Sequence, residues 1–164
     1  MTPVNWIPIE APGALGITPR PRGGDWLVDE VRAWRSAGVN RVVSALEPLE
    51  EAVLELEEES AECKRLGIVF ERFRVMDRST PAGNEANYNF VLKLAERLTD
   101  GESIVVHCRL GIGRSGMLCA ATLVALGLDS SEAFLRVSTA RGLQVPDTRQ
   151  QIEWVQTFER WRLQ

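Results

Sequence analysis

Hydrophobic and polar positions follow two different periods along the chain, one typical of helices and one typical of buried strands. Leu27, Val31 and Trp34 recur at helical spacing, and Gly38 follows them as a stop signal. Short apolar runs such as residues 104–106 predict buried strands. We therefore expect helices over residues 25–38, 48–66, 84–98, 114–126, 130–140 and 148–163, and strands over residues 39–46, 68–75 and 102–107.

Two stretches depart from this regular pattern. Residues 1–24 hold five of the eight prolines, which predicts an irregular N-terminal arm with one short strand. The helix predicted over residues 48–66 carries a run of glutamates, which we interpret as a solvated face rather than a binding site.

Strands that alternate with helices are typical of α/β domains with a parallel sheet. We therefore predict one domain over residues 1–164, built on a central, mainly parallel sheet flanked by helices. In such sheets ligands bind beyond the carboxyl ends of the strands. The loops after Leu46, Val75 and His107 should consequently gather at one edge.

Composition narrows the class of protein. The chain has 164 residues, 45% of them hydrophobic and 26% charged, which excludes a disordered or collagen-like chain. A net charge of −4 argues against duplex nucleic acid as a partner, because binding to it requires many Lys and Arg contacts to phosphate. No signal peptide is visible, and the longest apolar run, residues 117–128, is too short to span a bilayer. We expect a cytoplasmic protein without membrane contact.

Cysteine and histidine are sparse. The three cysteines, Cys63, Cys108 and Cys119, do not form a disulfide scaffold, although a protective disulfide between Cys63 and Cys108 is an alternative. Cys119 falls in an apolar helix and is predicted to be part of the core. A single histidine and the lack of paired ligand spacing make a zinc site improbable. We expect neither a metal nor another cofactor.

The most informative segment is HCRLGIGRSG, residues 107–116. Cys108 directly follows a predicted strand, and a helix is predicted to begin at Arg114. Gly111 and Gly113 allow the backbone between them to turn inward. A strand, a tight loop and a helix N-terminus together form a phosphate-binding loop, in which N–H groups and the helix dipole attract an anion.

The residue types in this loop match nucleophilic catalysis on a phosphate ester. Cys108 lies at the positive end of a helix, where a thiolate nucleophile is favoured. Arg114 can bind two phosphoryl oxygens through its planar guanidinium. Ser115 can donate a hydrogen bond to the thiolate, and His107 is better placed to hold the loop than to act as a base.

The segment resembles the signature of cysteine-dependent protein tyrosine phosphatases, His-Cys-x5-Arg-Ser/Thr, in its short dual-specificity form, and the resemblance covers about residues 20–162. It implies metal-independent hydrolysis of phosphomonoesters through a phosphocysteine intermediate, with Cys108 as the nucleophile. The phosphate would be bound by the Arg114 side chain and by the backbone N–H groups of Arg109, Leu110, Gly111, Ile112, Gly113 and Arg114.

The reaction also requires a general acid, because an alkoxide or phenoxide leaves poorly. Asp77 follows a predicted strand about 30 residues before Cys108, which matches the position of the family's mobile acid loop. Pro81 would stiffen the far end of that loop. Glu47 and Glu50 also lie near a strand end and are the rival candidates.

A glutamine often orients the hydrolytic water in relatives of this family. Here Gln151 has the better spacing from Arg141, and Gln150 is adjacent to it. The segment departs from the commoner Gln-Thr-x-x-Gln because Asp147 stands first. A position on a helix surface is the alternative interpretation of these glutamines.

A phosphorylated protein or peptide is the partner that these features favour. A phosphoinositide, inositol-phosphate or RNA 5′-phosphate phosphatase on the same scaffold is the first alternative. Lipid-directed relatives tend to carry lysines where this chain has Arg109 and Ile112, which favours protein phosphoesters. A phosphate-binding module without activity and a Cys-x5-Arg arsenate reductase or sulfurtransferase are the remaining alternatives. The short chain predicts a shallow site with mixed specificity, walled in part by Arg20 and Arg22.

Overall fold

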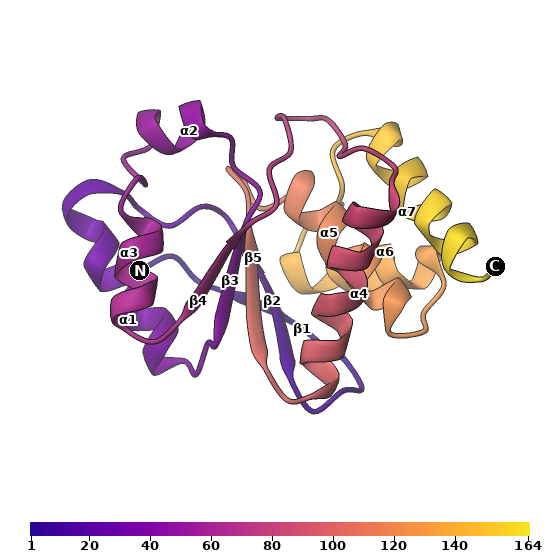
Figure 1. The fold of residues 1–164 in the computed structure, drawn as a ribbon, viewed down its shortest axis with the longest axis horizontal. Coiled ribbons are helices and arrows are strands. Elements are labelled where there is room, and N and C mark those ends of the chain that lie inside the picture. The colour runs from indigo at the N-terminus through magenta and orange to yellow at the C-terminus, as the bar shows by residue number, and fades with distance from the viewer.

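The computed structural model describes residues 1–164 and is built on one five-stranded sheet with the strand order β1-β2-β5-β3-β4 (Figure 1). The strands β2, β5, β3 and β4 are parallel, and β1 adds an antiparallel edge. The strands are β1 (Asn5–Ile7), β2 (Ala14–Thr18), β3 (Arg41–Ser44), β4 (Val69–Arg72) and β5 (Ser103–His107), and the helices are α1 (Leu27–Ser36), α2 (Pro48–Val53), α3 (Glu59–Arg65), α4 (Glu85–Thr99), α5 (Arg114–Ala125), α6 (Ser130–Arg141) and α7 (Arg149–Arg162). The predicted fold class is confirmed.

Helices cover both faces of the sheet. Helices α1 and α3 lie on one face, and α4, α5, α6 and α7 lie on the other (Figure 1). The larger apolar cluster joins the second set of helices to the sheet, and α5 is buried along almost its whole length. Because α5 lies at the centre of this cluster, its N-terminus and the loop that precedes it are held in a fixed position.

The prediction of an irregular arm over residues 1–24 is wrong. This segment contributes two strands, and β2 pairs with the central strand β5 along its full length. The sequence of β2 is short, and all but its first residue are buried. The prolines lie outside the two strands, so their number in the segment hid the pairing.

The single helix predicted over residues 48–66 is also wrong, because the chain forms two shorter helices, α2 and α3. Glu55 lies between them with φ 56°, a left-handed conformation that no helix continues through. The solvated face is wrong for two of the glutamates. Glu51 and Glu59 are buried, each against basic side chains or a histidine.

The carboxyl ends of the parallel strands meet at one edge, as predicted. There the loop after β2 packs on the loop after β5, and the Arg20 N–H donates to the Arg109 carbonyl at 3.1 Å. Gly111 has φ 71°, and a Cβ at this position would lie within 2.8 Å of backbone atoms of Thr18 and Pro19. The close approach of the two loops therefore requires glycine.

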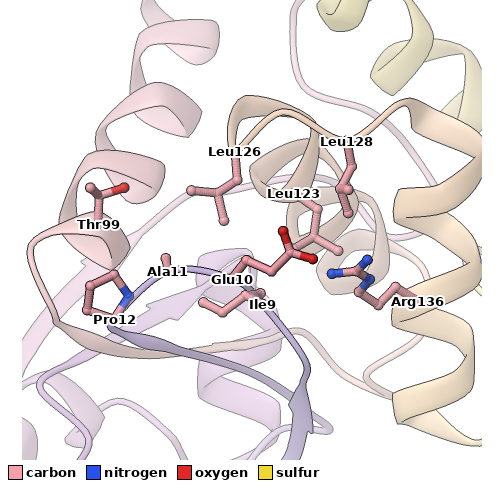
Figure 2. A pocket seen from close by; sticks show the side chains of 9 residues that line it. All are labelled: Ile9, Glu10, Ala11, Pro12, Thr99, Leu123, Leu126, Leu128 and Arg136. Carbon is pink, nitrogen blue, oxygen red and sulfur yellow. The ribbon is translucent and has the colours of Figure 1, made fainter.

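A pocket of about 320 Å³ lies at the opposite edge of the sheet (Figure 2). It is lined by the segment before β2, by the ends of α4 and α5, and by Arg136 of α6. None of the residues predicted for catalysis lines this pocket. Separately, the helices of the chain include none with both the length and the apolar character that crossing a bilayer requires.

Candidate active site

The loop between β5 and α5 has the geometry of an anion-binding site. Cys108 is buried at its base, and its Sγ lies 3.1 Å from the Ser115 Oγ in the first turn of α5. No hydrogen bond within the protein takes the backbone N–H groups of residues 109–113. A row of N–H groups without protein acceptors beside a helix N-terminus is suited to bind an anion.

The carbonyl groups of the same loop are bound from outside. Arg141, at the end of α6, donates from Nε to the Gly111 carbonyl at 2.9 Å and from Nη2 to the Leu110 carbonyl at 3.0 Å. These contacts turn the carbonyl groups away from the anion site. Arg141 was noted in the sequence only as a marker for a glutamine, and its role in holding the loop was missed.

Arg114 is buried, and its orientation is fixed by Glu50 and by the backbone carbonyl groups of Val75 and Ala45. Its Nη1 and Nη2 donate to the two carboxylate oxygens of Glu50 at 2.7 and 2.8 Å. Nη1 also donates to the Val75 carbonyl at 3.0 Å. One end of the guanidinium is thus fully engaged, and no protein group accepts from its Nε. The edge formed by Nε and Nη2 remains for two oxygens of an anion.

The Arg114–Glu50 pair is strongly ionic. Burial alone would lower the pKa of Arg114, but the hydrogen bonds to Glu50 and the charges of Cys108 and Asp77 raise that pKa. Burial alone would raise the pKa of Glu50, but the hydrogen bonds from Arg114 and from the Glu47 N–H lower it. Both side chains therefore stay charged at neutral pH.

Asp77 lies where the predicted acid loop should place it. Its Oδ1 is 3.3 Å from the Arg114 Nη2, and most of its side chain is exposed. The two rivals are engaged elsewhere: Glu47 and Glu50 form a capping box at the start of α2, and Glu50 also holds Arg114. Of the three candidate acids, Asp77 is the one with a carboxylate open to a substrate.

Gln151 and Asp147 both lie close to the loop, and a Cβ at Gly113 would be 3.1 Å from the Gln151 Nε2. Gln151 is buried; its Oε1 accepts from the N–H groups of Asp147 and Thr148, and its Nε2 donates to the Ser79 carbonyl. Asp147 lines the pocket at Cys108 instead. A Cβ at Gly113 would lie 2.5 Å from the Asp147 Oδ2, so the carboxylate packs directly on the loop backbone.

The pocket itself is small, about 30 Å³, and is lined by Asp77, Cys108, Arg109, Leu110, Gly113, Arg114 and Asp147. The Asp77 Oδ1 lies 3.3 Å from the Arg114 Nη2, and the exposed position of Asp77 allows its side chain to move when a phosphoryl group binds.

The other predicted residues are placed as follows. His107 is buried, and its Nδ1 lies 3.3 Å from the Cys108 carbonyl, a contact that holds the loop. Ile112 packs against the apolar core and adds no charge to the site. Cys63 and Cys119 are free and buried, and burial raises the pKa of each thiol. No group of three or more His, Cys, Asp or Glu side chains is arranged to hold a metal ion.

Comparisons with known proteins agree with this geometry. A family model described as "Polymorphic toxin system, DSP-PTPase phosphatase" matches residues 18–128, which include Asp77 and the whole loop from Cys108 to Arg114. The resemblance noted in the sequence is thereby confirmed.

Solved structures share the fold over nearly the whole chain. Kinase associated phosphatase, solved with its catalytic cysteine replaced by serine, superposes with a TM-score of 0.87 at 17% identity, over 98% of this chain and 95% of that chain. The active form of Tk-PTP gives 0.71 at 25% identity, over 95% and 97%. PTPMT1 in complex with PI(5)P gives 0.74 at 21% identity, over 90% of both chains.

Proposed function

Because the chain belongs to the polymorphic-toxin family of DSP-PTPase phosphatases, we propose that it hydrolyses phosphate esters on protein side chains, with Cys108 as its nucleophile. The family is one of cysteine-based phosphatases, so phosphomonoester hydrolysis is the activity of the chain. The assignment of residues to roles and the choice of protein substrates are the proposal.

In the first step the Cys108 thiolate attacks phosphorus while the bond to the ester oxygen breaks. Asp77 donates its proton to that oxygen, so the product leaves as an alcohol or phenol. The unpaired N–H groups of the loop and the Nε–Nη2 edge of Arg114 bind the three phosphoryl oxygens, where charge is carried in the transition state.

In the second step water attacks the phosphocysteine, and the bond between sulfur and phosphorus breaks. The Asp77 carboxylate accepts a proton from the water, and inorganic phosphate is released. Ser115 Oγ, 3.1 Å from the Cys108 Sγ, donates a hydrogen bond to the thiolate that leaves. Both steps balance in atoms and electrons without a metal ion or a redox partner.

The single observation that carries this proposal is the row of unpaired N–H groups between Cys108 and Arg114. Gly111 and Gly113 of this loop are buried, and a purely structural loop would pair their N–H groups within the protein. Here they converge with an arginine edge on the space above a thiol, which is the arrangement that a phosphoryl group in transfer to sulfur requires.

Protein substrates are favoured over polyphosphorylated lipids by the charge of the site. PTPMT1, which was solved with PI(5)P, shares this fold, so a phosphoinositide is the second candidate. In this chain, however, Ile112 is packed in the core, and the carboxylates of Asp77 and Asp147 line the pocket. Two carboxylates disfavour a headgroup with several phosphates more than they disfavour a single phosphoester.

The direct test compares wild type with Cys108→Ser on an aryl phosphate, with and without EDTA, and then on phosphopeptides and inositol phosphates. We expect EDTA to have no effect and Cys108→Ser to abolish turnover while still binding vanadate. Cys63→Ala, which removes a second buried thiol that does not line the pocket, is the matched control. Turnover by Cys108→Ser within about tenfold of wild type, on the scale of catalytic effects, would remove Cys108 from the reaction.

Asp77 is tested separately with substrates of different leaving groups. We expect Asp77→Asn to slow hydrolysis of a poor leaving group by about 10² to 10⁴, the usual contribution of a general acid. The loss should shrink when the leaving group is already acidic, because such a group needs no proton. Equal losses across the series would show that Asp77 has only a structural role.

A further inference from the structure

His107, the single histidine of the chain, lies between two hydrogen-bond acceptors. Its Nε2 is 2.7 Å from the Glu59 Oε2, and its Nδ1 is 3.3 Å from the Cys108 carbonyl oxygen. A carbonyl and an ionised carboxylate can only accept, whereas a neutral imidazole carries one N–H. With Glu59 ionised, both contacts are therefore hydrogen bonds only when the ring carries two N–H groups and is an imidazolium.

The pair of His107 and Glu59 is buried. The side chains of His107 and Glu59 expose 0% and 1% of their surface. Trp34 of α1 stacks on the imidazole with ring centroids 6.1 Å apart and an interplanar angle of 24°. A buried carboxylate is costly unless its partner carries the opposite charge, and a flat aromatic ring favours a cation beside it.

The buried polar atoms around the pair offer Glu59 no second hydrogen-bond partner. Glu59 Oε1 and Trp34 Nε1 are buried without a hydrogen-bond partner. With Oε1 unpaired, His107 is the one cationic partner in direct contact with Glu59, and Arg72 acts on its charge only from a greater distance. No other basic group makes an ion pair with Glu59.

The other titratable groups near the pair do not remove the charge on Glu59 or on His107. Glu51 of α2, which also favours the cation, is itself paired with Arg72 and Arg74. Cys63 of α3 stays neutral, because burial and the nearby Glu59 carboxylate raise the pKa of its thiol. For His107, burial opposes protonation, but the charge and hydrogen bond of Glu59 outweigh it, so the pKa of the imidazole is raised.

We propose that Glu59 is a positioning residue for the nucleophile: its buried carboxylate keeps His107 as an imidazolium, whose Nδ1–H fixes the Cys108 carbonyl. This inference rests on the proposed function of Cys108 in catalysis. Glu59 touches neither substrate nor reacting atoms, and it acts through His107.

Two consequences follow for the reaction. The hydrogen bond at the Cys108 carbonyl holds the backbone at the point where the loop leaves β5. The positive end of the pair lies toward the cysteine and the negative end lies on α3, so the pair favours the thiolate although its net charge is zero. Loss of the Glu59 charge should therefore matter most at low pH, where the thiolate is hardest to form.

The experiment uses the single histidine as its own reporter. In protein labelled with ¹⁵N-histidine, we expect both ring nitrogens of His107 to be protonated at pH 7, above the ordinary histidine pKa of about 6.5. This measurement needs no substrate, so it stands even if the protein turns over no phosphoester tested. A neutral ring at pH 7 in the wild-type protein would overturn the proposal without any variant.

The variant Glu59→Gln keeps a hydrogen-bonding group and removes the charge. We expect its His107 to be neutral at pH 7, and alkylation of Cys108 by iodoacetamide at pH 6 to slow by about tenfold. The loss of kcat/KM should be larger at pH 6 than at pH 8. Glu58→Gln, exposed and adjacent, is the matched control and should match wild type. A Glu59→Gln protein that keeps the imidazolium, or an equal loss at both pH values, would contradict the proposal.

Discussion

Two segments flank the phosphate-binding loop, and they use their polar side chains in opposite ways. The acidic segment of α2 and α3 supplies three carboxylates that each hold a cationic group: Glu50 holds Arg114, Glu51 holds Arg72 and Arg74, and Glu59 holds His107. The segment over residues 141–151 supplies Gln151, whose amide joins the start of α7 to the acid loop through three hydrogen bonds.

The difference shows which side chains orient the groups around Cys108. The glutamates looked like a solvated face, yet they orient the arginine and the histidine around the nucleophile. The glutamine is a candidate for orienting water, and in the structure it is buried and forms part of the N-terminal capping box of α7. Removing one partner of a buried ion pair leaves the other charge uncompensated. The role of a buried carboxylate is therefore set by the cation that it contacts.

The largest effect should come from Arg114, whose guanidinium joins the acidic segment to the phosphate. Lysine keeps a charge but cannot serve Glu50 at one edge and two phosphoryl oxygens at the other. We expect Arg114→Lys to lower kcat on the order of 10² or more, equivalent to roughly 3 kcal/mol, and nearly as much as Arg114→Ala. Steady-state kinetics, with circular dichroism to confirm folding, measures this. Retention of most activity by the lysine variant would mean that Arg114 supplies only positive charge.

A smaller effect is expected from Glu50, which orients that guanidinium without touching substrate. Glu50→Gln loses the charge and one of the two hydrogen bonds to Arg114. We expect kcat to fall on the order of tenfold, within the range of a hydrogen bond to a charged group. The exposed Glu57→Gln serves as the control. If the two variants have equal kcat, the acidic segment does not orient Arg114.

The smallest effect on kcat should come from Gln151. Its replacement by alanine leaves the Asp147 and Thr148 N–H groups and the Ser79 carbonyl without partners. We expect a loss of about 1–3 kcal/mol in the free energy of unfolding and a change in kcat of only a few-fold. Denaturant unfolding and pre-steady-state kinetics distinguish the two roles. Accumulation of phosphocysteine without a loss of stability, unlike in the exposed Gln150→Ala, would instead assign Gln151 to the hydrolytic water.

The sequence predicts the chemistry of the phosphate-binding loop better than it predicts the side chains that hold the loop in place. The strand, loop and helix around Cys108 were predicted, because apolar periodicity and glycine position are local signals. The parallel topology also predicted that Asp77 and Arg114 would lie at the same edge of the sheet, where the carboxyl ends of the strands meet. The partners Glu50 and Glu59 were not predicted as such, because pairing across elements depends on the break at Glu55, where one residue adopts a left-handed conformation.

The N-terminal arm was missed for a related reason. Strand β2 is only five residues long and gains its place from pairing with β5, a contact far away in the chain. The amino-acid composition of residues 1–24 shows the flanking prolines, but it contains no information about the pairing of β2 with β5. Likewise, Asp147 reaches the pocket only because Gln151 bonds its N–H and Gly113 leaves room for its carboxylate. Such contacts are set by tertiary packing, which propensity does not contain.

The central claim is that a phosphoryl group passes through Cys108. The most direct measurement is rapid acid quench of the wild-type enzyme during turnover of a ³²P-labelled aryl phosphate, followed by mapping of the labelled peptide. The account predicts label on Cys108, formed within one turnover, and none in the Cys108→Ser protein. Label on Ser115, or turnover without any labelled peptide, would contradict it.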